Sequence, residues 1–228
     1  MLPKAEAKAL SAARISIFRQ WSQELLDKPD ADGSLKVLAR AYTLAPTDAE
    51  VVAGIAYHTQ QALAALEKTS ASAMADHYAA VAKQFPKVDA VAEAGKAHAA
   101  RALDKLADDK KFKEALAAVG TYRPLLAKSG HEAEVAEMVY DRWARSLTAD
   151  EKWADALAKY KEGIKAYPTG KLLRNNAVAV VDEWAEAATK KRDWDAAIAV
   201  YKTGLDVLGN EEHLQGNKAY CERMKEKK

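Results

Sequence analysis

A stride of 41 residues separates the aromatic side chains in the C-terminal half of this chain. Phe112, Trp153 and Trp194 follow one another at this distance, and so do Trp143 and Trp184. Periods of about 20 to 50 residues indicate one supersecondary unit copied along the chain. A single unit of this kind cannot cover its own apolar face, so it must stack against its neighbours. The stride therefore restricts the fold to a stacked array of similar units.

Two more columns of residues share this stride, and the tryptophan column extends towards the N-terminus. Trp143 is preceded in its own column by Ala102, Gln61 and Trp21. The other columns are Tyr78, Val119, Tyr160 and Tyr201 within the second half of each unit, and Pro46, Pro86, Pro168 and Gly209 at its end. The columns predict five repeats in a single domain covering residues 1–228. The expected repeat ranges are about 5–46, 47–86, 87–127, 128–168 and 169–209.

Each repeat divides into two amphipathic helices. In the fourth repeat, Tyr140, Trp143, Ala144 and Leu147 fall at i, i+3, i+4 and i+7, which places them on one helical face. A second apolar stripe begins at Trp153, after a short polar break, and Pro168 cannot continue it. Hydrophobic residues make up 49% of the chain and only six residues are Pro. Ala, Leu, Lys and Glu, which favour helices, are abundant, so the predicted fold class is all-α.

The second helices resemble those of the tetratricopeptide repeat family. The residues that carry this resemblance are Trp153, Ala156, Leu157, Tyr160, Gly163 and Pro168, and again Trp194, Ala197, Ile198, Tyr201 and Gly204. The pairs Trp143-Ala144 and Trp184-Ala185 match the large and small residues of the family's first helix. The resemblance implies a right-handed α-α superhelix, or solenoid, of about five helix–turn–helix repeats. A capping helix is expected at about residues 211–225.

The period of this chain departs from that of the family. Tetratricopeptide repeats have about 34 residues, whereas the stride here is 40 to 41. The extra residues, about seven in each repeat, fall before the aromatic residue of the first helix. They correspond to about two helical turns at 3.6 residues each. Long first helices are therefore expected.

In the family, the first helices line a concave groove that holds a partner protein segment. Carrying that register over gives the candidate groove residues, which are Asp104, Glu134, Asp141, Arg145, Asn175, Asp182, Glu186, Lys190, Tyr220 and Arg223. Acidic side chains outnumber basic ones among the groove positions. The working hypothesis is therefore a scaffold for an extended or helical peptide that bears Lys or Arg, because charge complementarity selects partners. Ordinary solvated helix faces are the alternative interpretation.

Asn175 and Asn176, with Asn217 one period after Asn176, form a polar repeat with two interpretations. Asn side chains can hold a peptide backbone by donating and accepting hydrogen bonds together. Helix capping or local hydrogen bonding, which needs no partner, is the favoured interpretation.

Other functional classes find little support. The net charge is +2 and no basic block stands out, so no nucleic-acid partner is expected. The single Cys221 excludes an internal disulfide, and the five His include no His-Glu-x-x-His pair. No Gly-rich phosphate loop is present either. Taken together, these observations predict no metal, no cofactor and no catalytic residue. The chain is therefore predicted not to be an enzyme. The sequence shows no signal peptide and no membrane span, so a cytoplasmic location is expected.

The first repeat carries Ile15, Ile17, Phe18 and Trp21, more apolar surface than an end repeat usually shows. This surface suggests a homodimer or contact with a further domain. All five Trp are expected to be core residues. Two other functions remain open: an RNA-processing scaffold of the half-a-tetratricopeptide type, and a helical subunit of an enzyme complex.

Overall fold

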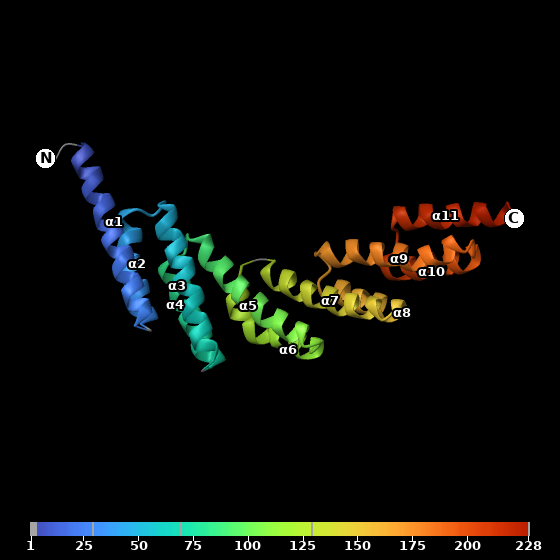
Figure 1. Cartoon of the computed structure of the whole chain (residues 1–228), viewed down its shortest axis with the longest axis horizontal. Helices are drawn as coiled ribbons and strands as arrows, with labels where there is room; N and C mark the ends of the chain where they lie inside the picture. The colour runs from blue at the N-terminus through green and yellow to red at the C-terminus, as the bar shows by residue number, and fades with distance from the viewer. Residues whose placement is uncertain (1–3, 29, 69, 129, 228) are drawn as a thin grey trace. The chain divides into compact units, whose positions relative to one another are not determined.

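The computed structural model describes residues 4–28, 30–68, 70–128 and 130–227 (Figure 1). These residues form eleven α-helices and one short 3₁₀ helix, and no strand. The all-α prediction is therefore confirmed. The helices are α1 (Lys4–Asp27), α2 (Ala31–Leu44), α3 (Ala49–Glu67), α4 (Ala71–Gln84), α5 (Asp89–Asp108), α6 (Phe112–Tyr122), η1 (Arg123–Leu126), α7 (His131–Ala149), α8 (Trp153–Ala166), α9 (Leu172–Lys190), α10 (Trp194–Leu208) and α11 (Glu212–Glu226).

Each predicted repeat range contains a long first helix followed by a shorter second helix. The first helices α3, α5, α7 and α9 have 19 or 20 residues, and α1 has 24. The second helices α2, α4, α8 and α10 have 14 or 15 residues. The expectation of long first helices is thus confirmed. In the third repeat, α6 has only 11 residues and continues into the 3₁₀ helix η1, which contains Pro124 near its start.

Local sequence explains where the helices begin and end. The side chains of Asp30, Asp48, Ser70 and Asp193 accept hydrogen bonds from backbone N–H groups in the first turns of α2, α3, α4 and α10. Such caps satisfy donors that have no partner inside the helix. The helices α2, α4 and α8 end two residues before Pro46, Pro86 and Pro168 respectively. The proline column of the sequence therefore marks repeat ends.

The turns between the two helices of repeats three, four and five share an unusual backbone conformation. Lys110, Glu151 and Arg192, each 41 residues apart, have φ angles of 59°, 59° and 57°. Directly after each one, a backbone N–H reaches back to close the preceding helix. For Glu151, the N–H of Lys152 donates to the Leu147 carbonyl at 2.9 Å. This left-handed closure is typically made by glycine, and here three charged residues make it.

We expect the Glu151→Gly variant to be more stable than the wild type. A residue with a Cβ pays about 1 kcal/mol or more for a left-handed conformation, whereas Gly does not. Gly also increases the entropy of the unfolded chain, which offsets part of this stabilisation. The free energy of unfolding is therefore expected to rise by about 0.5 kcal/mol. Urea unfolding followed by circular dichroism measures it. The Glu151→Ala variant is the control, because Ala keeps the strain, and equal stability of the two variants would contradict this account.

The chain forms two compact units. The N-terminal unit comprises Met1–Ala102 and Ala118–Glu132, and the C-terminal unit comprises Leu103–Ala117 and Ala133–Lys228. In the N-terminal unit, α1 packs on α2, α2 on α3 and α3 on α4, and α4 also contacts η1. In the C-terminal unit, α8, α9, α10 and α11 pack in succession. The single domain and the handedness of the superhelix stay predictions.

Each unit buries its own apolar core. Ile55, Leu63 and Met74 are buried in the N-terminal unit, and Leu157, Leu173 and Val181 in the C-terminal unit. Among the tryptophans, Trp194 is buried, Trp143, Trp153 and Trp184 are partly buried, and Trp21 is 44% exposed. The prediction that all five Trp are core residues is therefore wrong for Trp21. Its helix, α1, packs its other faces on α2 and α3.

Candidate functional site

Asp141 stands at a junction of three helices in the C-terminal unit. Its Oδ1 accepts a hydrogen bond from the Tyr160 hydroxyl of α8 at 2.8 Å and from the Asn176 amide of α9 at 2.7 Å. Its Oδ2 accepts from Arg145 Nε, one turn further along α7, at 2.8 Å. The Asp141 side chain is only 13% exposed. One carboxylate therefore joins both helices of the fourth repeat to the first helix of the fifth.

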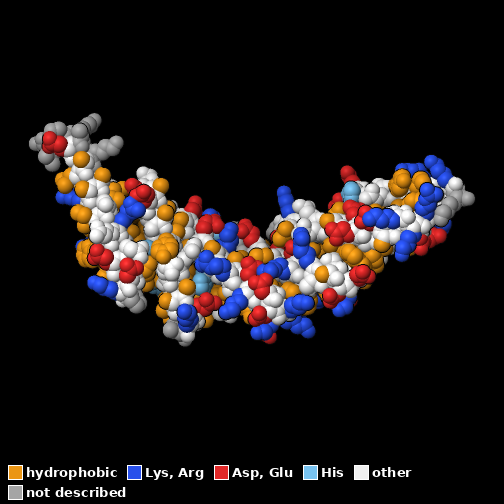
Figure 2. Space-filling view, viewed as in Figure 1, with side chains coloured by type: hydrophobic (Ala, Val, Ile, Leu, Met, Phe, Trp, Pro, Cys, Tyr) orange, Lys and Arg blue, Asp and Glu red, His pale blue; other side chains and the backbone are white. Residues whose placement is uncertain are grey.

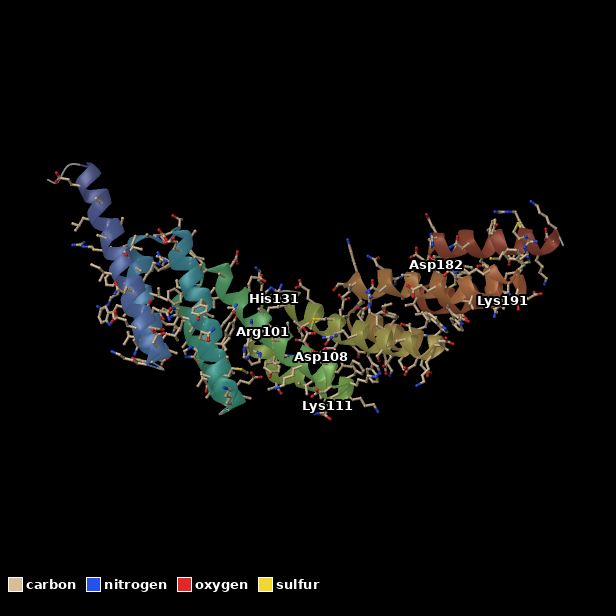
Figure 3. The ribbon with its side chains drawn as sticks, viewed as in Figure 1. Arg101, Asp108, Lys111, His131, Asp182 and Lys191 are labelled. Atoms are coloured by element: carbon tan, nitrogen blue, oxygen red, sulfur yellow. The ribbon has the colours of Figure 1, made fainter. Side chains whose placement is uncertain are left out.

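The same junction recurs 41 residues later, where Asp182 accepts from the Asn217 amide of α11 at 2.9 Å. Asp182 Oδ2 also lies 2.6 Å from His213 Nε2. Figure 3 labels Asp182 on the side of α9 that faces α11. The acid–amide contact of Asp141 with Asn176 is thus repeated by Asp182 with Asn217, and Tyr160 and Tyr201 are the tyrosines of the two copies. We call each copy a junction network.

The tyrosines of the junction networks are held in their protonated form. Burial raises the pKa of Tyr160, and the hydrogen bond to Asp141 raises it further. Burial also raises the pKa of Tyr201 to about 12, with the neighbouring Asp182 charge as the second cause. A phenol that donates to a carboxylate loses this bond on ionisation. Tyr160 therefore acts as a fixed donor to Asp141.

The asparagine repeat of the sequence is now explained. Asn176 and Asn217 donate to the two junction carboxylates, which is the local hydrogen bonding that the sequence left open. Helix capping is the wrong interpretation, because Lys171 occupies the N-cap of α9. Asn175 is exposed on α9.

The other predicted groove residues have mixed surroundings. Asp104 accepts from Arg142 Nη1 at 2.6 Å, and Glu186 forms an ion pair with Lys190 at 2.8 Å. Glu134 and Arg223 are exposed, and Tyr220 is 49% exposed with its ring nearly perpendicular to that of Trp194. All ten candidates lie in the C-terminal unit, but Asp104, Asp141, Asp182 and Glu186 each engage a neighbouring group of the chain. The expected acidic character of this face is reduced accordingly.

Two hollows lie at equivalent positions between consecutive first helices. The smaller, of about 90 Å³, lies between α7 and α9 and is lined by Arg145, Asn176, Ala179 and Glu183 among others. The larger, of about 590 Å³, lies between α1 and α3 in the N-terminal unit. None of the groove residues predicted from sequence lines the larger hollow. The register of the tetratricopeptide family was applied only to the third, fourth and fifth repeats and to the last helix.

The repeat register explains why the hollow between α1 and α3 is open. Its floor includes Leu38 and Ala53, which occupy the repeat positions of Tyr160 and Asn176. Between the fourth and fifth repeats, the longer side chains of Tyr160 and Asn176 reach Asp141 and fill the junction. Between the first and second repeats, the shorter side chains of Leu38 and Ala53 leave space. The rim carries Arg19, Gln20 and Gln23 from α1, and Glu50 and Tyr57 from α3.

Glu137 is a buried acid that sequence analysis missed. It lies on α7, is 5% exposed, and its Oε1 has no hydrogen-bond partner among the described residues. A Cβ on Gly170 would overlap its carboxylate, so Gly170 allows this close approach. Burial raises the pKa of Glu137, and the charge of Glu134 raises it further.

We expect Glu137→Gln to stabilise the protein at neutral pH by about 1 kcal/mol, because an unpartnered buried group costs more when it is charged. The folded-state pKa lies above the unfolded value, so the wild type loses stability as the pH rises between these two values. The gain should therefore shrink towards pH 4. Urea unfolding between pH 4 and 8 tests this, with the exposed Glu183→Gln as control. A gain that is independent of pH would contradict it.

The histidines and the remaining acids show no metal site. Among the described residues, no group of three or more His, Cys, Asp or Glu is placed to hold a metal ion. His98 of α5 instead lies 3.5 Å from the Glu67 carboxylate, which also accepts from the Tyr122 hydroxyl at 2.6 Å. Cys221 is buried. Within the part of the chain described, no helix combines the length and apolar character that a membrane span requires.

Comparisons with known proteins identify no family for this chain. No protein-family model matches the chain, and no curated protein matches it. Among solved structures, the chain is similar to one from a functional characterization of Pseudomonas aeruginosa pilF, with 15% sequence identity and a TM-score of 0.25. The similarity covers 95% of this chain and 86% of that chain. A TM-score of this size adds nothing to the fold class, which follows from the helices of this chain.

Proposed function

We propose that this protein is an interaction scaffold without catalytic activity, which holds a peptide segment of a partner protein between its first helices. The observation that carries this proposal is the hollow of about 590 Å³ between α1 and α3. Its volume is within the range of ligand pockets, about 300 to 1,000 Å³. It lies at a repeat position that side chains fill elsewhere in the chain.

The lining of this hollow suits a peptide. Leu38, Ala53 and Gly54 offer an apolar floor for one side chain, and Gln20 and Gln23 offer amides at the rim. Amides can both donate to and accept from a peptide backbone. Arg19 and Glu50 form an ion pair across the hollow, between α1 and α3.

Peptides selected from a displayed random library against the full chain test the proposal. Ala53→Trp places a large ring in the hollow and is expected to weaken a selected peptide at least tenfold in calorimetry. Ala158→Trp is the matched control, because Ala158 is exposed on the second helix α8. If no selected peptide binds, or if the control weakens binding as much as Ala53→Trp, the proposal is wrong.

We also propose that a partner segment held by the first helices of the C-terminal unit bears Lys or Arg, in keeping with the acidic residues of these helices. This preference now depends on exposed acids such as Glu183, since Asp141 and Asp182 belong to the junction networks. Selected peptides should then be enriched in basic residues and bind more weakly at higher salt. RNA should give no binding at low salt, and binding there would favour the RNA-processing alternative.

Co-purification of a catalytic subunit would favour the enzyme-complex alternative. A second copy of the chain is the other partner that we propose, through the first repeat.

A further inference from the structure

The outer face of α1 carries a regular stripe of exposed side chains. The stripe consists of Leu10, Arg14, Ile17, Trp21 and Glu24 on α1, together with Lys28 directly after the last helical residue, Asp27. Their spacing alternates between four and three residues, as in helices that pack along each other in coiled coils. Leu10, Ile17 and Trp21 are 45%, 62% and 44% exposed, and Figure 2 shows hydrophobic side chains along this helix. We call these six residues the α1 stripe.

The same repeat positions are covered in later repeats. Trp143, which corresponds to Trp21, stacks on Phe112 with ring centroids 5.7 Å apart and ring planes 9° apart. Val139, which corresponds to Ile17, is fully buried. Phe112 begins the second helix of the preceding repeat. The α1 stripe therefore has the chemistry of a surface that packs against another helix, and it continues the repeat-to-repeat interface of this fold.

We propose that a second copy of the chain covers the α1 stripe, with the two α1 helices packed antiparallel about a twofold axis near residue 19. This inference rests on the proposal above that a second copy is a partner. In this register Ile17 of each copy meets Trp21 of the other, and Arg14 meets Glu24 of the other. A parallel pairing would oppose Arg14 to Arg14 and Glu24 to Glu24. Charge complementarity therefore selects the antiparallel arrangement.

The size of the stripe sets the expected affinity. From Leu10 to Lys28 it extends over about 27 Å of helix at 1.5 Å per residue. Two helices in contact over this length bury less than about 1,200 Å², an area found in weak or transient complexes. We expect a dissociation constant on the order of 10 to 100 μM, which corresponds to about −6.8 to −5.5 kcal/mol.

Sedimentation equilibrium of the full chain over a concentration series that spans this constant tests the dimer. The average mass should rise from 24.8 kDa towards twice that value. Trp21→Glu should weaken the association at least tenfold. Leu172→Glu is the matched control, because Leu172 is 42% exposed but lies on α9. A wild type that stays monomeric at all concentrations, or a dimer that Trp21→Glu leaves intact, overturns the proposal.

Charge reversal tests the register. Arg14→Glu and Glu24→Arg each place like charges opposite one another twice, so each should weaken association about fivefold or more. The double variant restores both pairs in the antiparallel register and should associate like the wild type. In a parallel register the single variants would have no effect. If the double variant remains as weak as the single ones, the proposed pairing is wrong.

Circular dichroism of Trp21→Glu should match the wild type, because the replaced side chain is exposed and outside the core. Peptide binding at the hollow between α1 and α3 should also be unchanged in this variant, since Trp21 does not line it. Loss of dimerisation with retained peptide binding would separate the two proposals. Failure of peptide binding in a wild type that dimerises would leave the α1 pairing supported and the peptide scaffold refuted.

Discussion

Replacing Asp141 with Ala is expected to lower the free energy of unfolding by about 2 to 4 kcal/mol, since it orphans a buried hydroxyl and breaks three hydrogen bonds of a network. Tyr160 is fully buried, so water cannot replace the lost acceptor. Asn176 and Arg145 would lose the same partner. This effect is larger than an acidic residue on a helix surface would produce.

Chemical denaturation of Asp141→Ala beside Asp206→Ala measures this effect. Asp206 is exposed on α10, and its removal should change stability by less than about 0.5 kcal/mol. A double-mutant cycle of Asp141→Ala with Asn176→Ala should show a coupling free energy of about 1 kcal/mol or more, as expected for residues in one network. Additive effects would show that the junction network contributes nothing as a unit.

The Gly95→Ala variant is expected to lose about 2 to 3 kcal/mol, at the upper end of what overpacking costs. A Cβ on Gly95 would lie 2.8 Å from the Leu125 carbonyl oxygen and 2.7 Å from the Tyr78 ring. Leu125 is fully buried in η1, so its backbone cannot easily give way. The close approach of α5 to its neighbours therefore requires glycine at this position.

Gly120→Ala is the matched control within the same unit. Gly120 is in α6, and a Cβ there would meet nothing within 4 Å. Ala should then stabilise the helix by about 0.5 to 1 kcal/mol, because Gly has poor helix propensity. Thermal unfolding of both variants should move in opposite directions. A loss of stability in both would mean that helix packing does not decide the effect.

Much of the fold was predictable because the helix pairs follow from the spacing of the apolar positions. The columns that begin at Trp21, Tyr78 and Pro46 placed the helix pairs, and the longer stride predicted the longer first helices. Trp21 shows the limit of this reasoning. Its column predicts a packed residue, but whether a column position is buried depends on what lies against it. The sequence of one repeat does not show which surface packs against that repeat.

The candidate site was predicted less well, since side-chain charge does not reveal what a residue hydrogen-bonds. Asp141 and Asp182 were predicted as groove acids from their register, yet their carboxylates accept from Asn176 and Asn217. The signal was present in the sequence, because Asp, Tyr and Asn all recur with the 41-residue stride. Glu137 could not be found at all, since one acidic residue on a helix gives no sign of its burial.

The recurrence of the junction network also bears on how the array can change its length. Between Asp141 and Asp182 the chain holds one full set of the three residue types, Tyr160 and Asn176 included. Copying this 41-residue segment in tandem would give every new boundary a matched acid, phenol and amide. Duplication of this segment in the C-terminal unit would therefore keep an acid, a phenol and an amide together at each boundary between repeats. A copy of the boundary between the first and second repeats, where Leu38 and Ala53 replace the phenol and the amide, would lack these partners.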